Sequence, residues 1–227
     1  YEQGRQDEQE NTETIDENKL IVCLDAGHGG KDNGSDYRLR YEKNDNLKIT
    51  QAVAAYLADK EDVQVIMTRS DDTFLSLEER TTFANQNNAD YFVSLHRNTG
   101  EGNGVETWIR SDADDKAQAL AQNIMDNLDA AGISRNRGVK KGTQKSESKD
   151  YYVNLHTNMP ACIVELGFMN SPTDNQLFDA NIDSYAKAIG DAVLKTYESY
   201  GKDGADAKES VEDVPGTEEQ TSTETGT

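Results

Sequence analysis

Two histidines and one glutamate stand where they could bind a metal ion. His28 lies in a glycine-rich turn directly after an apolar run, and Glu42 precedes a helical pattern. His96 ends a second apolar run. Two imidazoles and a carboxylate form the ligand set of a catalytic zinc site with one position left open for water. These residue types therefore predict a catalytic zinc site.

Each of these residues has an alternative interpretation when it is taken alone. The glycines at 27, 29 and 30 allow positive φ and close backbone approach to a ligand, yet His28 could also be a packed turn residue. Glu42 could simply be an acidic residue near a helix start. His96 could be a structural residue that closes a buried strand. Only their combination favours a metal site.

Glu165 lies inside an apolar run over residues 162–168. An unpaired carboxylate is costly to bury, so this residue either pairs with a cation or takes part in the chemistry. A buried carboxylate beside a metal-bound water is suited to act as a general base. Asn98 could orient a neighbouring group or close a turn, and His156 could be a substrate contact or a rim residue.

Strands and helices alternate between residues 20 and 200, which predicts a single α/β domain with a mostly parallel twisted sheet and helices on both faces. Residues 134–150 have no periodicity and are expected to form a surface loop. The other expected elements are strands at 20–24, 63–68, 91–95, 104–109 (an edge strand) and 161–166, helices at 47–57, 75–87, 113–131 and 182–200, and a short extended piece at 151–155.

Three of the reactive side chains are expected at one edge of this sheet. His28, His96 and Glu165 all stand at or just past the carboxyl end of a predicted strand. Ligands of parallel sheets bind beyond that end of the strands. The topology therefore predicts that segments far apart in sequence meet there.

The 227-residue chain has a formal net charge of −20, and more than half of it lies in the two ends. Residues 1–19 hold seven acids against two basic residues, and residues 201–227 hold eight against two. We interpret 1–19 as an acidic linker, 20–200 as the catalytic domain and 201–227 as an acidic tail, with both ends disordered because they hold few large apolar residues. The acidity argues against nucleic acid as a partner. Cys23 and Cys162 are expected to be buried free thiols.

Five segments resemble, in order and spacing, the zinc-dependent N-acetylmuramoyl-L-alanine amidases of the amidase-3 family. They carry the turn of His28, the segment of Glu42, a stretch with Arg69 and Arg80, the His96 strand and the Glu165 strand. The similar segments are residues 25–34, 42–47, 68–85, 89–98 and 160–174.

The resemblance implies one zinc ion held by His28, Glu42 and His96, with Glu165 as general base. It also implies hydrolysis of the amide between N-acetylmuramic acid and L-alanine in bacterial peptidoglycan. Two positions depart from the family: Arg97 stands where alanine is frequent, and His156 where arginine is commoner. Both departures, together with Asn98, are candidate substrate contacts. Between Ile109 and Val139 there is no room for a long inserted regulatory helix, so an open site is expected.

Two other functions remain open at this level. A carboxypeptidase-like zinc peptidase would need a cation for a terminal carboxylate, for which Arg69, Arg80 and Arg97 are candidates. An inactive wall-binding module would have lost a ligand or Glu165, and all four residues are present. We expect a monomer acting outside the cytoplasm on peptidoglycan or muropeptides, because no membrane span is visible and the chain begins like a trimmed exported protein.

Overall fold

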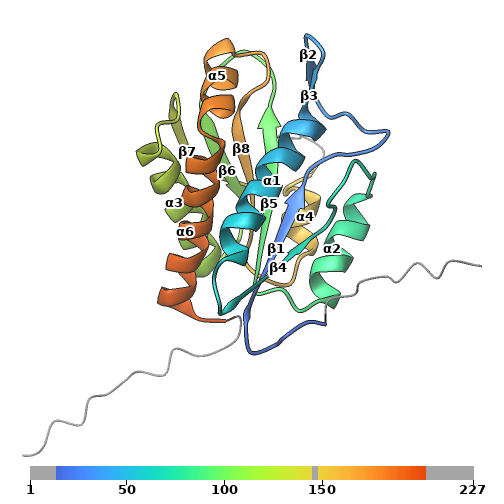
Figure 1. The fold of residues 1–227 in the computed structure, drawn as a ribbon, viewed down its shortest axis with the longest axis vertical. Coiled ribbons are helices and arrows are strands. Elements are labelled where there is room, and N and C mark those ends of the chain that lie inside the picture. Colours follow the sequence, from blue (N-terminus) through green and yellow to red (C-terminus); the bar gives the residue numbers. More distant parts are fainter. Residues whose placement is uncertain (1–13, 145–147, 203–227) are drawn as a thin grey trace, which may run out of the picture.

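The computed structural model describes residues 14–144 and 148–202. Its centre is a six-stranded sheet in the order β4-β1-β5-β8-β6-β7 (Figure 1). The first four of these strands are parallel, β6 runs antiparallel to β8, and β7 is parallel to β6. The strands are β1 (Leu20–Ala26), β4 (Val63–Met67), β5 (Tyr91–Asn98), β6 (Val105–Ile109), β7 (Asn136–Lys141) and β8 (Ala161–Phe168).

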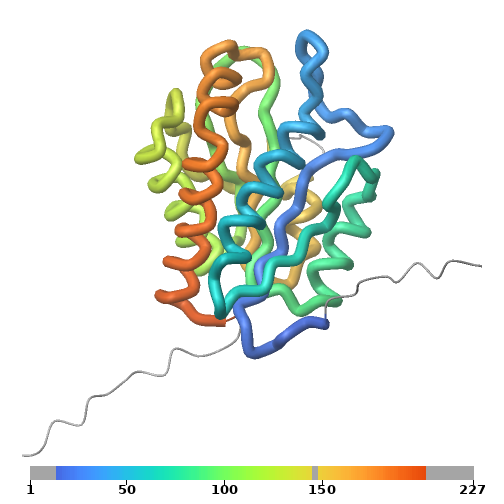
Figure 2. The backbone as a smooth tube through the Cα atoms, viewed as in Figure 1, coloured from blue at the N-terminus to red at the C-terminus, as the bar shows by residue number. Residues whose placement is uncertain are grey.

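Helices cover both faces of the sheet, as the alternating pattern predicted. On one face, α6 (Ile182–Tyr200) packs between α1 (Glu42–Ala58) and α3 (Asp115–Ala130). The other face carries α2 (Leu77–Gln86) and the short α4 (Tyr152–His156), which contact each other. Helix α5 (Pro172–Ala180) follows β8, and a two-stranded hairpin of β2 (Asp36–Tyr37) and β3 (Arg40–Tyr41) projects beside α1 (Figures 1 and 2).

Burial on both faces explains why β1 is a continuous apolar run. Its alternate side chains enter two separate cores, with Val22 in the core under α1 and α6 and Cys23 in the core under α2 and α4. Cys162 of β8 belongs to the first of these cores. The two thiols therefore lie on opposite faces of the sheet, and the expectation of buried free cysteines is confirmed.

Local signals account for the helix ends close to the site. Helix α2 begins with a capping box, in which the Ser76 side chain and the Glu79 backbone and side chain satisfy each other. Helix α3 is preceded by Asp114, whose carboxylate caps the helix by accepting a hydrogen bond from the Ala117 N–H.

No helix in the described ranges is long and apolar enough to cross a membrane.

Several predicted boundaries were wrong. The supposed loop at 134–150 contains β7, so the strand at 104–109 is not an edge strand. The sequence of β7 is polar, and this strand is held by backbone pairing to β6 rather than by an apolar face. The piece at 151–155 is helical, as α4, and is too short for its periodicity to be recognised. Helix α5 was not predicted, α1 begins at Glu42 rather than near residue 47, and β5 continues to Asn98.

Candidate active site

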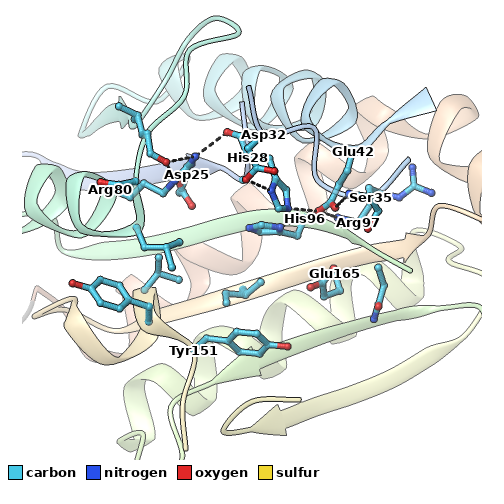
Figure 3. Close-up of a pocket in the computed structure, with 18 of the residues that line it drawn as sticks. Asp25, His28, Asp32, Ser35, Glu42, Arg80, His96, Arg97, Tyr151 and Glu165 are labelled. Atoms are coloured by element: carbon cyan, nitrogen blue, oxygen red, sulfur yellow. Dashed lines mark hydrogen bonds and ion pairs between the residues drawn. The ribbon is translucent and has the colours of Figure 1, made fainter. Parts of the chain in front are cut away.

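His28, Glu42 and His96 come together at the carboxyl edge of the sheet. One ligand atom from each lies within 4.8 Å of the others. Oε1 of Glu42 is 3.3 Å from Nε2 of His28 and 2.9 Å from Nδ1 of His96 (Figure 3). Ligand atoms bound about 2.0–2.2 Å from one ion lie at most roughly 4 Å apart, and the two contacts of Glu42 are within this limit.

Charge also favours a cation between these three side chains. Burial by itself would lower the pKa of His28, but hydrogen bonds and charge from Glu42 and Asp32 raise it to about 9. Burial would raise the pKa of Glu42, but the two imidazoles hold it far below its usual range. The carboxylate thus remains an anion facing two nitrogens, which is the donor set that zinc prefers.

The turn after β1 brings His28 into the site through unusual backbone geometry. His28 itself has a φ of 61°, in the left-handed region, and Gly29 and Gly30 also have positive φ. Gly27 is required for a different reason, since a Cβ there would lie 2.2 Å from the His96 ring. The glycines therefore serve both the turn and the close packing of the two histidines.

Two buried arginines hold this turn by its carbonyl groups. Arg69 donates hydrogen bonds to the carbonyls of Ala26 and Gly27. Arg80 donates to the carbonyls of Ala26 and His28 and pairs with the buried carboxylate of Asp25 at 2.7 Å. Arg69 and Arg80 thus support the turn that carries His28.

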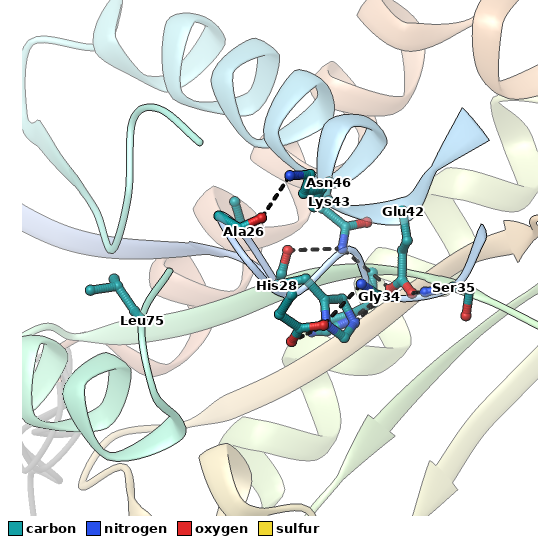
Figure 4. A network of polar contacts seen from close by, with 12 residues as sticks. Ala26, His28, Gly34, Ser35, Glu42, Lys43, Asn46 and Leu75 are labelled. Carbon is teal, nitrogen blue, oxygen red and sulfur yellow. Dashed lines mark hydrogen bonds and ion pairs between the residues drawn. The ribbon is translucent and has the colours of Figure 1, made fainter. Parts of the chain in front are cut away.

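Glu42 is held in place at the first residue of α1. Its Oε2 accepts a hydrogen bond from the Ser35 N–H at 2.8 Å (Figure 4). Its Oε1 accepts a hydrogen bond from the Arg97 N–H at 3.1 Å (Figure 3). Asn46, one turn further along α1, donates to Oε1 at 3.3 Å and to the Gly27 carbonyl at 3.2 Å. One carboxylate is therefore tied to the hairpin, to β5 and to the turn of His28.

Asp32 is a site residue that our sequence reasoning did not single out. Its Oδ2 lies 2.8 Å from Nδ1 of His28, and its Oδ1 accepts the Gly34 N–H. A carboxylate on the second imidazole nitrogen fixes the tautomer and ring orientation of a metal-binding histidine. The signal was present, because Asp32 follows His28 by four residues inside the glycine-rich turn.

Glu165 lies on the strand next to His96. The two residues are paired in the register of β5 and β8, and Glu106 of β6 is paired with Glu165 on its other side. Oε2 of Glu165 is buried and has no hydrogen-bond partner among the described residues. Burial, reinforced by the charges of Glu42 and Glu106, raises the pKa of Glu165 to about 7 against the opposing effect of His96.

Glu106, which is paired with Glu165 across β6 and β8, is also buried, but its carboxylate has several polar partners. It pairs with Arg137 at 2.7 Å and accepts hydrogen bonds from Asn98, Trp108 and Gln144. The contrast between Glu106, with many partners, and Glu165, with a bare oxygen, marks Glu165 as the carboxylate that is available for proton transfer.

A cavity of about 790 Å³ opens over these residues on the face of α2 and α4 (Figure 3). The cavity is lined by residues 74–77, including Phe74 and Leu77, and by residues from the segment 148–156, including Tyr151 and Leu155. His28, Glu42, His96 and Glu165 line the same cavity. Apolar walls around a few polar groups are typical of an enzyme site.

The three candidate substrate contacts occupy different environments. His156 lies on the exposed rim, where its ring stacks on Tyr152 at 3.8 Å, and it lines the cavity. Asn98 also lines the cavity and donates to Glu106. The side chain of Arg97 is fully buried against Asp45 and Asn175, so only its backbone reaches the site. A substrate contact by this guanidinium does not agree with its burial.

Comparison with known proteins agrees with this geometry. The family model described as N-acetylmuramoyl-L-alanine amidase, amidase-3, matches residues 22–195. The chain belongs to the amidase-3 family. YqiI of Bacillus subtilis strain 168 is 36% identical over 182 residues, which cover 79% of this chain and 84% of YqiI. The probable cell wall amidase LytH of Staphylococcus epidermidis (strain ATCC 12228) is 30% identical over 79% of this chain, which spans 57% of that LytH.

Solved structures of N-acetylmuramoyl-L-alanine amidases share the fold. An N-acetylmuramoyl-L-alanine amidase from Clostridium difficile 630 has a TM-score of 0.74 and 34% identity, over 81% of this chain and 100% of that one. The catalytic domain of the amidase CwlV from Bacillus (Paenibacillus) polymyxa var. colistinus has a TM-score of 0.70 and 32% identity, over 78% and 98%. The predicted fold class and amidase-3 membership are therefore confirmed.

Proposed function

We propose that this amidase-3 chain is a zinc-dependent enzyme that hydrolyses the amide between N-acetylmuramic acid and L-alanine in peptidoglycan. His28, Glu42 and His96 hold the ion, and Glu165 is the general base. The observation that carries this proposal is the bare, buried Oε2 of Glu165 beside two histidines and a carboxylate with the donor set of zinc. Relatives named as cell wall amidases support peptidoglycan as the substrate and a location outside the cytoplasm.

The protein's own side chains account for the proton transfers. A zinc ion held by these residues would polarise the scissile carbonyl as a Lewis acid and lower the pKa of the attacking water. Glu165 takes a proton from the water as the oxygen of the water bonds to the carbonyl carbon. Glu165 then delivers this proton to the nitrogen of L-alanine as the carbon–nitrogen bond breaks. The products are a free muramic acid carboxyl group and a peptide with a free L-alanine amine.

A carboxypeptidase-like activity is less well supported. Such an enzyme would need a free cation for the terminal carboxylate of its substrate. Arg69 and Arg80 are bound to the turn of His28, and Arg97 is bound to Asp45. Each of these guanidinium groups is buried.

An inactive wall-binding module is also disfavoured. Such a module gains nothing from an unpaired buried carboxylate, whose burial costs free energy. Oε2 of Glu165 is buried without a hydrogen-bond partner among the described residues, beside three side chains that could hold zinc. A functional base explains why the cost is tolerated.

The test is release of L-alanine amino groups from purified peptidoglycan, with zinc content measured on the same protein. The parent protein should release them, and Glu165→Gln should lose about 10²–10⁴-fold of the rate while it retains zinc. Glu101→Gln, an exposed matched substitution, should behave like the parent. Zinc binding without release by the parent would indicate a binding module. Release of single carboxy-terminal amino acids would indicate the peptidase.

A further inference from the structure

Arg97 occupies a position that packing alone would give to an apolar residue. Along β5, Tyr91, Val93 and Leu95 point into the core under α1 and α6, and Arg97 continues the same row. Its side chain has no exposed surface. Burying a guanidinium is costly unless it is fully paired, and an apolar side chain at such a position is often as stable or more so. The arginine therefore calls for an explanation other than packing.

The guanidinium of Arg97 is paired on every side. Nη1 donates to Asp45 at 2.6 Å, and Nη2 donates to Asn175 at 2.7 Å. The group also lies over the Phe178 ring, 4.3 Å from its centroid. Asp45 accepts a second hydrogen bond from Arg40 at 2.6 Å, and Arg40 makes a two-point contact with Asp179 of α5. The charges form a continuous chain of two arginines and two aspartates, in the order Arg97, Asp45, Arg40 and Asp179.

This network joins the two elements that carry Glu42 and His96. Arg97 follows His96 directly on β5, and Asp45 follows Glu42 by one turn of α1. The backbone N–H of Arg97 also donates to Oε1 of Glu42 at 3.1 Å, the same oxygen that meets both histidines. The Arg97–Asp45 pair thus ties the end of β5 to the start of α1 directly behind the metal site.

We propose that the buried Arg97–Asp45 pair positions Glu42 and His96 for metal binding and so sets the zinc affinity of the site. The inference rests on the proposed function, because it assigns zinc to these ligands. Arg97 and Asp45 are positioning residues, and neither touches the substrate. Loss of either charge frees α1 to move against β5, which separates the two ligands and leaves the other charge buried without its partner.

The experiment measures zinc affinity by chelator competition and, separately, the thermal unfolding of the metal-free protein. Asp45→Asn and Arg97→Met should weaken zinc binding about 10–100-fold. Ile49→Val is the matched control, because it removes one methylene from the buried face of the same helix without touching the network. It should leave zinc affinity within about twofold of the parent.

The double variant Arg97→Met/Asp45→Leu separates positioning from folding. An apolar replacement for both charges should restore much of the stability that the single variants lose, while zinc affinity remains low. Parental zinc affinity in the double variant, or in either folded single variant, would overturn the proposal. So would a loss of affinity that merely follows the loss of stability across all variants, including Ile49→Val. A parent protein that binds no zinc would instead refute the proposed function.

Discussion

His96 and Glu165 occupy paired positions on the neighbouring parallel strands β5 and β8. The pairing puts a predicted metal ligand and the predicted general base side by side, although 69 residues separate them in the sequence. Backbone hydrogen bonds of a central sheet hold both residues, so their separation does not depend on a mobile loop. The position of Glu165 beside His96 affects the pH dependence of both the activity and the stability.

The activity should fall in acid because Glu165 must be unprotonated to accept a proton. Burial raises its pKa to about 7, and the charge of a bound cation lowers it again. The acidic limb of a plot of kcat/KM against pH is therefore expected at or below pH 7, with about a tenfold loss per pH unit beneath it. Rates measured between pH 5 and 9 on one muropeptide check this. A kcat/KM that rises as the pH falls from 7 to 5 would contradict the role of Glu165 as a base.

The same residue should make the metal-free protein less stable at alkaline than at acidic pH. The pKa of Glu165 in the folded state lies above its ordinary value of 4.5. The contribution of Glu165 to the free energy of unfolding is therefore fully present below pH 4.5 and is lost as the pH rises through about 7. Glu165→Gln should therefore raise the free energy of unfolding at pH 8 by up to about 3 kcal/mol, relative to its effect at pH 4. Urea unfolding of both metal-free proteins at the two pH values measures this difference. An equal effect at both would show that Glu165 does not titrate in this range.

Gly27→Ala should impair zinc binding more than it impairs folding. The new Cβ would lie 2.2 Å from the His96 ring, so the imidazole must leave its place. We expect at least a tenfold loss of zinc affinity, comparable to the loss of an orienting contact. Gly132→Ala is the control, since it has a positive φ but nothing within 4 Å of the added atom. It should lower the unfolding midpoint and leave zinc affinity unchanged.

Asp32→Asn should weaken zinc binding through the orientation of His28. The substitution keeps the side chain's shape but removes the carboxylate that faces Nδ1 of His28 at 2.8 Å. Substitutions of this kind typically cost about 10–100-fold in metal affinity. Chelator competition measures the change, and Asp36→Asn in the nearby hairpin serves as the control. Equal zinc affinities in the Asp32→Asn and Asp36→Asn variants would show that Asp32 does not orient His28 for zinc binding.

Arg80→Met should destabilise the whole domain. It leaves the buried carboxylate of Asp25 without its cation, removes the Arg80 hydrogen bond to the His28 carbonyl, and leaves the Ala26 carbonyl with Arg69 alone of its two arginine donors. Breaking a buried ion pair on one side costs about 3–5 kcal/mol. Chemical denaturation measures this loss. A cost below about 1 kcal/mol, as for an exposed pair, would show that the arginine does not hold the turn.

Much of the α/β organisation could be predicted because burial on both faces leaves a strong pattern in the sequence. The strands around residues 20–24, 91–95 and 161–166 are apolar except at Ser94 and Glu165, and the helix at 182–200 keeps a regular buried stripe. By contrast, β7 and α4 are polar or short, and backbone pairing and tertiary contacts alone define them. Disorder was predicted for residues 1–19 and 201–227, of which 1–13 and 203–227 lie outside the described residues, and it stays a prediction.

The candidate site also contains some features that could be predicted from the sequence and others that could not. The glycine-rich turn of His28 and the carboxylate inside an apolar strand were visible in the sequence, because positive φ and a buried charge demand particular residue types. The roles of Asp32 and Arg97 were not visible, because an acidic turn residue or an arginine after a histidine suits many environments. Only the tertiary structure decided that Asp32 faces His28 and that Arg97 turns away from the cavity toward Asp45. Residue types indicate which positions must be buried or must adopt a positive φ. The partner of a charged side chain depends instead on which distant segments the sheet brings into contact.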